Sequence, residues 1–153
     1  MKYIDTSALV KYYGNPEFEK GIDEITDLIE KANQGKEVLV TSIFTIGEAV
    51  SVFDRWIRIK AITEEEFSKI IARFLVDIEK LNNTGGLIIE SINPLSIIFS
   101  IEHIIKHHMP INDSLHLYTA LTLKLQIEQF ISSDEMQLNA AKKEGLCTWN
   151  PEM

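Results

Sequence analysis

The protein has 153 residues and a net charge of −8 at pH 7, with 45% hydrophobic and 25% charged residues. These values exclude an intrinsically disordered chain and predict that residues 1–153 form a single domain. The single cysteine excludes an intrachain disulfide, and Asp5 in the N-terminal segment disfavours a signal peptide. No run of about 18 uncharged apolar residues marks a membrane span. We therefore expect a cytoplasmic protein with no membrane partner.

The N-terminal segment predicts a strand followed by two helices. Residues 2–5 form a short apolar run, and Thr6 or Ser7 can cap the helix that follows it. Pro16 suits the start of a second helix, at residues 17–33.

The middle of the chain predicts one strand and two long helices. Residues 38–41 read as a strand, and Ser42 can cap the helix after it. The apolar residues of that helix recur at helical spacing, at Ile43, Ile46, Ala49, Val50 and Phe53. Thr63 with Glu66 forms a capping box, which predicts another helix that ends near residue 81.

The C-terminal half continues the alternation of strands and helices. In chain order we expect a strand at 87–92, a helix opened by Pro94 and broken by Pro110, a helix at 112–125 capped by Asn112, a strand at 129–132, a helix at 134–145 and a short strand at 146–148. This alternation predicts an α/β fold with three layers, α/β/α, around a mostly parallel central sheet.

Four acidic residues lie where such a fold binds its ligands, beyond the carboxyl ends of the strands. Asp5 ends the first strand, and Asp134 follows the fourth. Asp113 lies in the first turn of a helix after Pro110, and Glu48 lies on an otherwise apolar helix face, where a carboxylate needs a partner or a cation. We therefore expect these four side chains to converge.

Converging carboxylates repel one another, and hard divalent cations such as Mg²⁺ or Mn²⁺ relieve that repulsion. Ions of this kind can polarise a phosphodiester and activate a water molecule, so the pattern favours metal-dependent phosphoryl chemistry. Each residue also has a simpler interpretation. Asp5, Asp113 and Asp134 could only cap or favour helix N-termini, and Glu48 could lie on a solvated face.

Four segments resemble the ordered motifs of PIN-domain proteins. They are MKYIDTSALVKYY, TSIFTIGEAVSVF, INDSLHLYTALTL and FISSDEMQLNAAKKEG, and together they extend over essentially the whole chain. Each segment alone is a weak signal, whereas the set in this order is fairly specific.

The resemblance implies a metal-dependent endoribonuclease with a PIN-like fold. The acidic positions of the family fall on Asp5, Glu48, Asp113 and Asp134, as catalytic residues and ligands of Mg²⁺ or Mn²⁺, and the supporting hydroxyls fall on Ser7 and Ser132. Many small members are the toxins of VapBC toxin–antitoxin pairs, so the resemblance implies an RNA substrate, an antitoxin protein as partner, and a homodimer. Residues 55–83 hold a long predicted helix in a region that varies among such proteins, and we expect this region to set dimerisation, partner choice or substrate access.

Several other side chains have both a functional and a simpler interpretation. His103 and His107 are one helical turn apart and could bind zinc, but no cysteine or closely following acidic residue completes a site, so a surface role is favoured. His116, one turn after Asp113, could line the site, although packing is the favoured interpretation. Trp56 and Trp149 could stack on bases but more often pack in a core or interface.

The basic stretch Arg55, Arg58 and Lys60 is a candidate RNA or partner contact, although such a stretch is usually a solvated face. The net charge of −8 argues against nucleic-acid binding unless cations or local basic patches compensate. The main alternative is therefore a non-catalytic PIN-like scaffold that binds RNA or protein. An aspartyl phosphatase is disfavoured because Ser7 stands where a second aspartate is needed, and a receiver domain because Asp5 stands alone.

Overall fold

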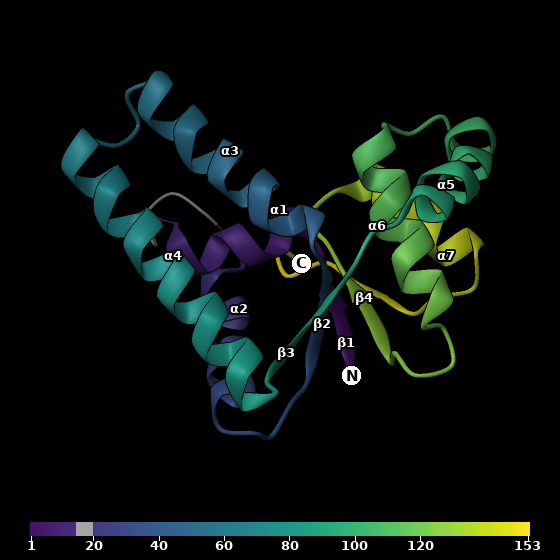
Figure 1. The fold of residues 1–153 in the computed structure, drawn as a ribbon, viewed down its shortest axis with the longest axis horizontal. Coiled ribbons are helices and arrows are strands. Elements are labelled where there is room, and N and C mark those ends of the chain that lie inside the picture. Colours follow the sequence, from purple (N-terminus) through teal and green to yellow (C-terminus); the bar gives the residue numbers. More distant parts are fainter. Residues whose placement is uncertain (15–19) are drawn as a thin grey trace.

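Five parallel strands form the central sheet of the computed structural model, which describes residues 1–14 and 20–153. In chain order they are β1 (Lys2–Ile4), β2 (Leu39–Ser42), β3 (Leu87–Glu90), β4 (Gln129–Ile131) and β5 (Thr148–Trp149). Their order across the sheet is β3-β2-β1-β4-β5, and every neighbouring pair is parallel. The sheet passes through the middle of the molecule in Figure 1.

Helices cover both faces of this sheet. They are α1 (Thr6–Leu9), η1 (Val10–Tyr13), a 3₁₀ helix, α2 (Ile22–Asn33), α3 (Phe44–Arg58), α4 (Glu64–Thr84), α5 (Pro94–His107), α6 (Ile111–Thr122) and α7 (Glu135–Lys143). Figure 1 shows α2, α3 and α4 on one side of the strands and α5, α6 and α7 on the other. The predicted three-layer α/β/α fold is confirmed.

Alternate residues of the three central strands β2, β1 and β4 enter two separate cores, because successive side chains in a strand point to opposite faces. Ile4 and Ile131 pack in one core with apolar side chains of α1 to α4. Tyr3 and Phe130 pack in the other with α6 and α7, and their rings stack with centroids 5.2 Å apart. Burial of these central strands on both faces explains why their segments are apolar runs rather than alternating patterns.

The pairing of β1 with β4 positions the residues that follow these strands. Ile4 pairs with Ile131, and the next residues, Asp5 and Ser132, therefore leave the sheet side by side. The backbone N–H of Asp5 donates to the carbonyl of Ile131 at 3.0 Å, which extends the ladder to the site itself.

Two long helices, α3 and α4, form a hairpin that extends beyond the sheet (Figure 1). The predicted capping box is present: the hydroxyl of Thr63 accepts from the N–H of Glu66, and the N–H of Thr63 donates to the carboxylate of Glu66 at 2.7 Å. This hairpin accounts for most of the segment 55–83 that the sequence marked as variable, and its helix runs to Thr84 rather than to residue 81.

Three predicted helix caps are wrong. Ser42 is the last residue of β2 and Ile43 takes the N-cap position of α3, although the hydroxyl of Ser42 still accepts from the N–H of Phe44 at 3.1 Å. The first helix is capped by the carboxylate of Asp5, which accepts from the N–H of Ala8, and not by Thr6 or Ser7, which already lie in the first turn. Asn112 also lies within a helix, because Pro110, whose backbone is extended at ψ 158°, is the N-cap residue of α6 and the helix begins at Ile111.

Some predicted boundaries are also displaced. The helix expected to continue to residue 125 ends at Thr122, and the last strand is Thr148–Trp149 rather than 146–148. The predicted start of the second helix, at Pro16 and residue 17, lies outside the described residues, within which α2 begins at Ile22. No helix in the part of the chain that the structure describes combines the length and apolarity needed to cross a bilayer.

Candidate active site

A cleft of about 830 Å³ at the carboxyl ends of the strands is lined by all four acidic residues singled out from the sequence. Asp5 follows β1 directly, Glu48 lies on α3, Asp113 lies in the first turn of α6, and Asp134 is the N-cap residue of α7. Elements from four distant parts of the chain thus bring these carboxylates to one place.

Asp5 is the most buried and most constrained of the four carboxylates. Its side chain accepts from the N–H of Ala8 at 3.0 Å, from the hydroxyl of Ser7 at 2.9 Å and from the hydroxyl of Ser132 at 2.8 Å. Burial raises the pKa of Asp5, although the nearby His116 and these donors act in the opposite direction. The carboxylate is therefore fixed in orientation before any ligand arrives.

The two predicted supporting hydroxyls, Ser7 and Ser132, both contact Asp5 and lie 3.3 Å from each other. Ser132 also accepts from the backbone N–H of Asp134 at 2.9 Å, and its oxygen lies 2.9 Å from the side-chain oxygen of Gln137. A hydroxyl has a single proton, so Ser132 donates either to Asp5 or to Gln137 at one time. Through Ser132 the orientation of Asp5 is coupled to the start of α7.

Asp134 caps α7 and lines the cleft at the same time. Its Oδ1 accepts from the N–H groups of Met136 at 2.8 Å and Gln137 at 3.1 Å. The capping role that a simpler interpretation gave this residue is thus real, but it occupies only one of the two carboxylate oxygens. Capping and ligand binding are compatible here.

Asp113 shows the mutual repulsion of the cluster most clearly. Burial, the charge of Asp134 and the charge of Asp5 together raise the pKa of Asp113 to about 6. A carboxyl group with such a pKa is close to half protonated in mildly acidic solution, because neighbouring like charges disfavour its ionised form. A cation placed among these groups would favour the ionised form.

Glu48 is held by donors from two other elements. The hydroxyl of Thr6 on α1 donates to its Oε2, and Nε2 of His116 on α6 lies 2.7 Å from the same oxygen. Burial raises the pKa of Glu48, but the hydrogen bond and charge of His116, with hydrogen bonds from Thr6 and Asn112, outweigh it and lower the pKa overall. Glu48 is therefore an anion at neutral pH.

His116 connects Glu48 to the sheet. It is only 2% exposed, and its Nδ1 lies 2.9 Å from the hydroxyl of Tyr3 on β1. Burial and the charge of Asp5 raise the pKa of Tyr3 well above its ordinary value, so the tyrosine keeps its proton. Its hydroxyl can donate to Nδ1 of a neutral imidazole or accept from Nδ1–H of a protonated one, and in either arrangement Nε2–H of His116 donates to Glu48.

The donor set fits a hard divalent cation. It consists of carboxylate and hydroxyl oxygens, which Mg²⁺ and Mn²⁺ prefer. No three of the four carboxylates bring oxygens within 4.8 Å of one another, although each belongs to the described residues. That spacing leaves room for water molecules between some of the carboxylates and an ion, and Mg²⁺ usually keeps several of its waters.

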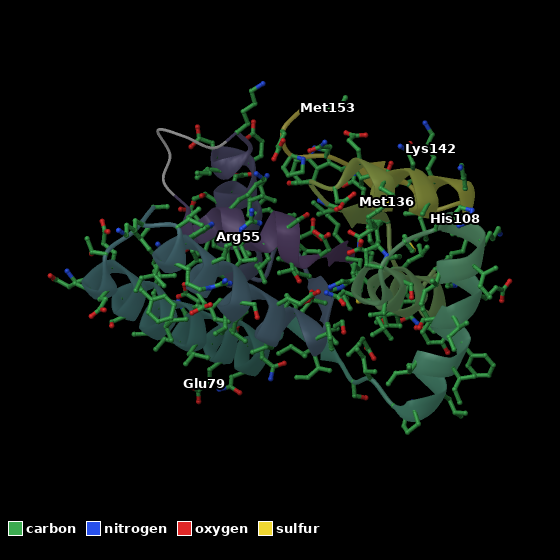
Figure 2. All side chains as sticks on the ribbon, turned by 90° about the horizontal axis from the view of Figure 1, so that it is seen from above. Arg55, Glu79, His108, Met136, Lys142 and Met153 are labelled. Atoms are coloured by element: carbon green, nitrogen blue, oxygen red, sulfur yellow. The ribbon has the colours of Figure 1, made fainter. Side chains whose placement is uncertain are left out.

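Arg55 and Arg58 line the cleft on the α3 side, where Figure 2 labels Arg55. Arg58 donates to Asp54 on its own helix at 2.7 Å. Lys60, the third member of the predicted basic stretch, lies beyond the end of α3 and does not line the cleft. The two arginines place positive charge beside the acidic cluster of a chain whose net charge is −8.

Sequence reasoning missed or misjudged several polar residues of this site. His116 was expected to pack, yet it hydrogen-bonds Glu48, and Thr6 and Gln137 were given no role in the site. The spacing of His116, three residues after Asp113 on one helix, was the available signal, because such residues share a helix face. Gln137 carried no comparable pattern.

Trp56 and Trp149 are both partly buried and pack against the core, so packing is the interpretation that the structure supports for the two tryptophans.

Comparison with known families decides the classification. The model of the PIN domain family matches residues 2–143. The chain belongs to the PIN-domain family. For this PIN domain, no curated protein matches significantly.

Solved structures with this fold are similar to the PIN domain over nearly its whole length. The complex of FitAB with a DNA fragment contains a chain with a TM-score of 0.68 and 14% identity, which covers 100% of this chain and 96% of that one. VapC20 of Mycobacterium tuberculosis, a toxin that cleaves the sarcin–ricin loop, matches with a TM-score of 0.63 and 12% sequence identity. The match covers 95% of this chain and 96% of VapC20. PAE2754 of Pyrobaculum aerophilum matches with a TM-score of 0.63 and 15% sequence identity. The match covers 96% of this chain and 82% of PAE2754. At such identities the likeness shows the fold.

Proposed function

We propose that this PIN domain, formed by residues 1–153, is an Mg²⁺- or Mn²⁺-dependent endoribonuclease that hydrolyses RNA phosphodiesters. The observation that carries the proposal is the presence of Asp5, Glu48, Asp113 and Asp134 in one cleft. PIN domains are generally nucleases, and none of the four acidic positions is substituted here.

In this proposal Asp5, Glu48, Asp113 and Asp134 hold the cation and are the catalytic residues. When bound, the ion supplies charge that polarises the phosphodiester and favours an ionised water. Ser7 and Ser132 keep the carboxylate of Asp5 oriented, through the hydroxyl contacts of 2.9 and 2.8 Å. Residues that fix the ligands of a metal in this way normally contribute to its affinity.

His116 and Thr6 have a positioning role in the same proposal. Their contacts keep Glu48 ionised and directed at the cleft, so that it is ready to bind a cation at neutral pH. Arg55 and Arg58 on the rim are suited to attract the phosphates of a strand that enters the cleft.

We further propose that the protein is the toxin of a VapBC-type toxin–antitoxin pair and acts on RNA in the cytoplasm. The fold shared with the VapC20 toxin and with FitAB supports this assignment. An antitoxin partner would have to engage an acidic molecule, so we expect it to present basic side chains near the cleft, complementary to the net charge of −8.

A homodimer belongs to this proposal, with α5 in its interface. Large apolar side chains on α5 are exposed, including Ile105 at 70%, Leu95 at 58%, Ile98 at 57% and Phe99 at 54%. Apolar side chains that cluster on one exposed helix mark an interaction surface. We propose that α5 of a second copy of the same protein covers this surface, since most oligomers are formed by identical chains.

The experiment that tests the proposed activity is incubation of the purified protein with structured and single-stranded RNAs, and with matched DNAs, in Mg²⁺, in Mn²⁺ and in EDTA. We expect RNA to be cut in either metal and to stay intact in EDTA and in the DNA controls. Binding of RNA without cleavage in any metal would instead support the non-catalytic scaffold.

A further inference from the structure

A second cluster of metal-ligating side chains lies away from the acidic cleft, between the C-terminal ends of α5 and α7. His103 and His107 are one turn apart on α5, and Glu144 is the C-cap residue of α7. One ligand atom from each of the three lies within 4.8 Å of the others. The contact between His107 and Glu144 joins the two helix ends, and Figure 2 labels the neighbouring residues His108 and Lys142 toward the same edge of the molecule.

The three side chains are directed at a common point. Nε2 of His107 lies 2.6 Å from Oε1 of Glu144, and Nδ1 of His103 lies 3.9 Å from the same oxygen. The two imidazole rings are nearly parallel, at 13°, as expected for a pair on one face of a helix. Two nitrogens and one carboxylate oxygen therefore face one another.

A buried atom without a partner points independently to a missing ligand. His103 is only 9% exposed, and its Nδ1 is buried with no hydrogen-bond partner. Buried polar groups in folded proteins are normally satisfied, so this nitrogen calls for an explanation. A metal ion between His103, His107 and Glu144 would supply one.

The ligand types distinguish this cluster from the acidic cleft. Two imidazoles and one carboxylate suit Zn²⁺, which binds nitrogen and oxygen together and accepts three protein ligands with water in the fourth position. Mg²⁺ prefers oxygen alone. None of the three residues lines the cleft, and Asp134 and Glu144 lie at opposite ends of α7, about 15 Å apart at 1.5 Å per residue.

We propose that His103, His107 and Glu144 form a second metal site, which binds Zn²⁺ or a similar transition-metal ion and ties the end of α5 to the end of α7. The ion would hold in place the helix that carries the exposed apolar face. Lys106 now competes for this place, since its ammonium group lies 2.7 Å from Oε1 of Glu144. Its side chain is 53% exposed and can move into solvent as the ion enters.

The test is Zn²⁺ binding to the full chain in excess Mg²⁺, measured by competition with a chromophoric zinc chelator. We expect the wild type to bind one Zn²⁺. His107→Gln and Glu144→Gln should weaken its affinity by at least about tenfold, since even loss of a group that only orients a metal ligand costs 10–100-fold. Lys106→Met, which removes the competing charge, should tighten binding.

Two controls separate this site from others. His108→Asn removes an exposed imidazole next to the cluster and should leave the zinc affinity unchanged, since asparagine tolerates the left-handed backbone at φ 54°. Asp5→Asn should also leave it unchanged, because it alters only the acidic cleft. Absence of zinc binding by the wild type, or full binding by folded His107→Gln, would overturn the proposal, as would loss of binding in Asp5→Asn.

Discussion

Glu48 and His116, which lie 68 positions apart in the chain, are joined by a contact of 2.7 Å between Oε2 and Nε2. The contact spans the cleft from α3 to α6, and Tyr3 anchors the imidazole from the sheet at 2.9 Å. A buried histidine between a tyrosine and a carboxylate links the two helical layers at the point where the acidic residues meet. The position of Glu48 in the cleft therefore depends on His116 and Tyr3, which are not among the four acidic residues.

Replacement of His116 by glutamine should raise the pKa of Glu48. At present the lowered pKa of Glu48 contributes stability at neutral pH, and this contribution is lost as the pH falls through the folded-state value. We expect His116→Gln to destabilise the protein by about 1–3 kcal/mol at pH 7, because Tyr3 and Glu48 lose the imidazole as their hydrogen-bond partner. Urea unfolding at several pH values should show this difference shrinking in acid. A difference that is independent of pH would contradict the predicted link.

Asp113→Asn should stabilise the metal-free protein. A carboxyl group with a raised folded-state pKa contributes stability at low pH, and that contribution is lost as the pH rises from its unfolded value of about 4 to about 6. Above pH 6 the wild type therefore carries an unfavourable charge that the variant lacks. We expect a gain of roughly 1–2 kcal/mol at pH 7.5, reduced for partial solvent screening, and none near pH 4.

Mn²⁺ should stabilise the wild type by binding only to the folded state. At a concentration 100 times its dissociation constant, the expected gain is about 2.7 kcal/mol. The gain should be much smaller in Asp113→Asn, which has lost one carboxylate of the cluster, and unchanged in Asp27→Asn, an exposed aspartate that pairs with Lys31 on α2. Calorimetric unfolding with and without Mn²⁺ measures these gains. Equal gains in all three proteins would place the ion elsewhere.

The neighbouring serines 132 and 133 offer a matched comparison. Ser132 donates to Asp5 at 2.8 Å and accepts from Asp134, whereas the hydroxyl of Ser133 is buried without a hydrogen-bond partner. We expect Ser132→Ala to cost about 1–3 kcal/mol and most of the activity, and Ser133→Ala to be neutral or slightly stabilising. Stability and cleavage measured on both variants test this, and similar losses in the two would refute the orienting role of Ser132.

The proposed dimer interface can be tested on α5. A charge placed at the most exposed apolar residue of that helix, in Ile105→Glu, should convert the dimer to a monomer, because an unpaired charge would be buried in the interface. Ile59→Glu, at an equally apolar and exposed position after α3, is the control and should leave the dimer intact. Light scattering after size exclusion gives the mass. A wild-type monomer would remove α5 from the proposal.

The sequence was sufficient to predict the fold class, because apolar strand runs and capping residues are local features. Asp5 and Asp134 could be placed at strand ends for the same reason. Ser132 could be placed beside Asp5 only by resemblance, since the register of β1 with β4 is set by packing and not by any local pattern.

The features that the sequence did not predict depend on contacts between distant segments. Tyr3 reaches His116 only because two strands and a helix meet, and Tyr3 had no polar role in any local pattern. The pair His103 and His107 lacked an acidic ligand in sequence because Glu144 follows 37 residues after His107, at the end of another helix. The capping role of Asp5 was underestimated because Thr6 and Ser7, good capping residues themselves, follow it directly.

The central claim is that the carboxylates of the cleft cleave RNA with a bound cation. Its most direct test compares initial rates of RNA cleavage in Mn²⁺ by wild type, Asp5→Asn and the surface control Asp27→Asn, each shown to be folded. We expect Asp27→Asn to match the wild type and Asp5→Asn to lose cleavage entirely while it keeps its stability. Equal cleavage by Asp5→Asn and the wild type would contradict the claim.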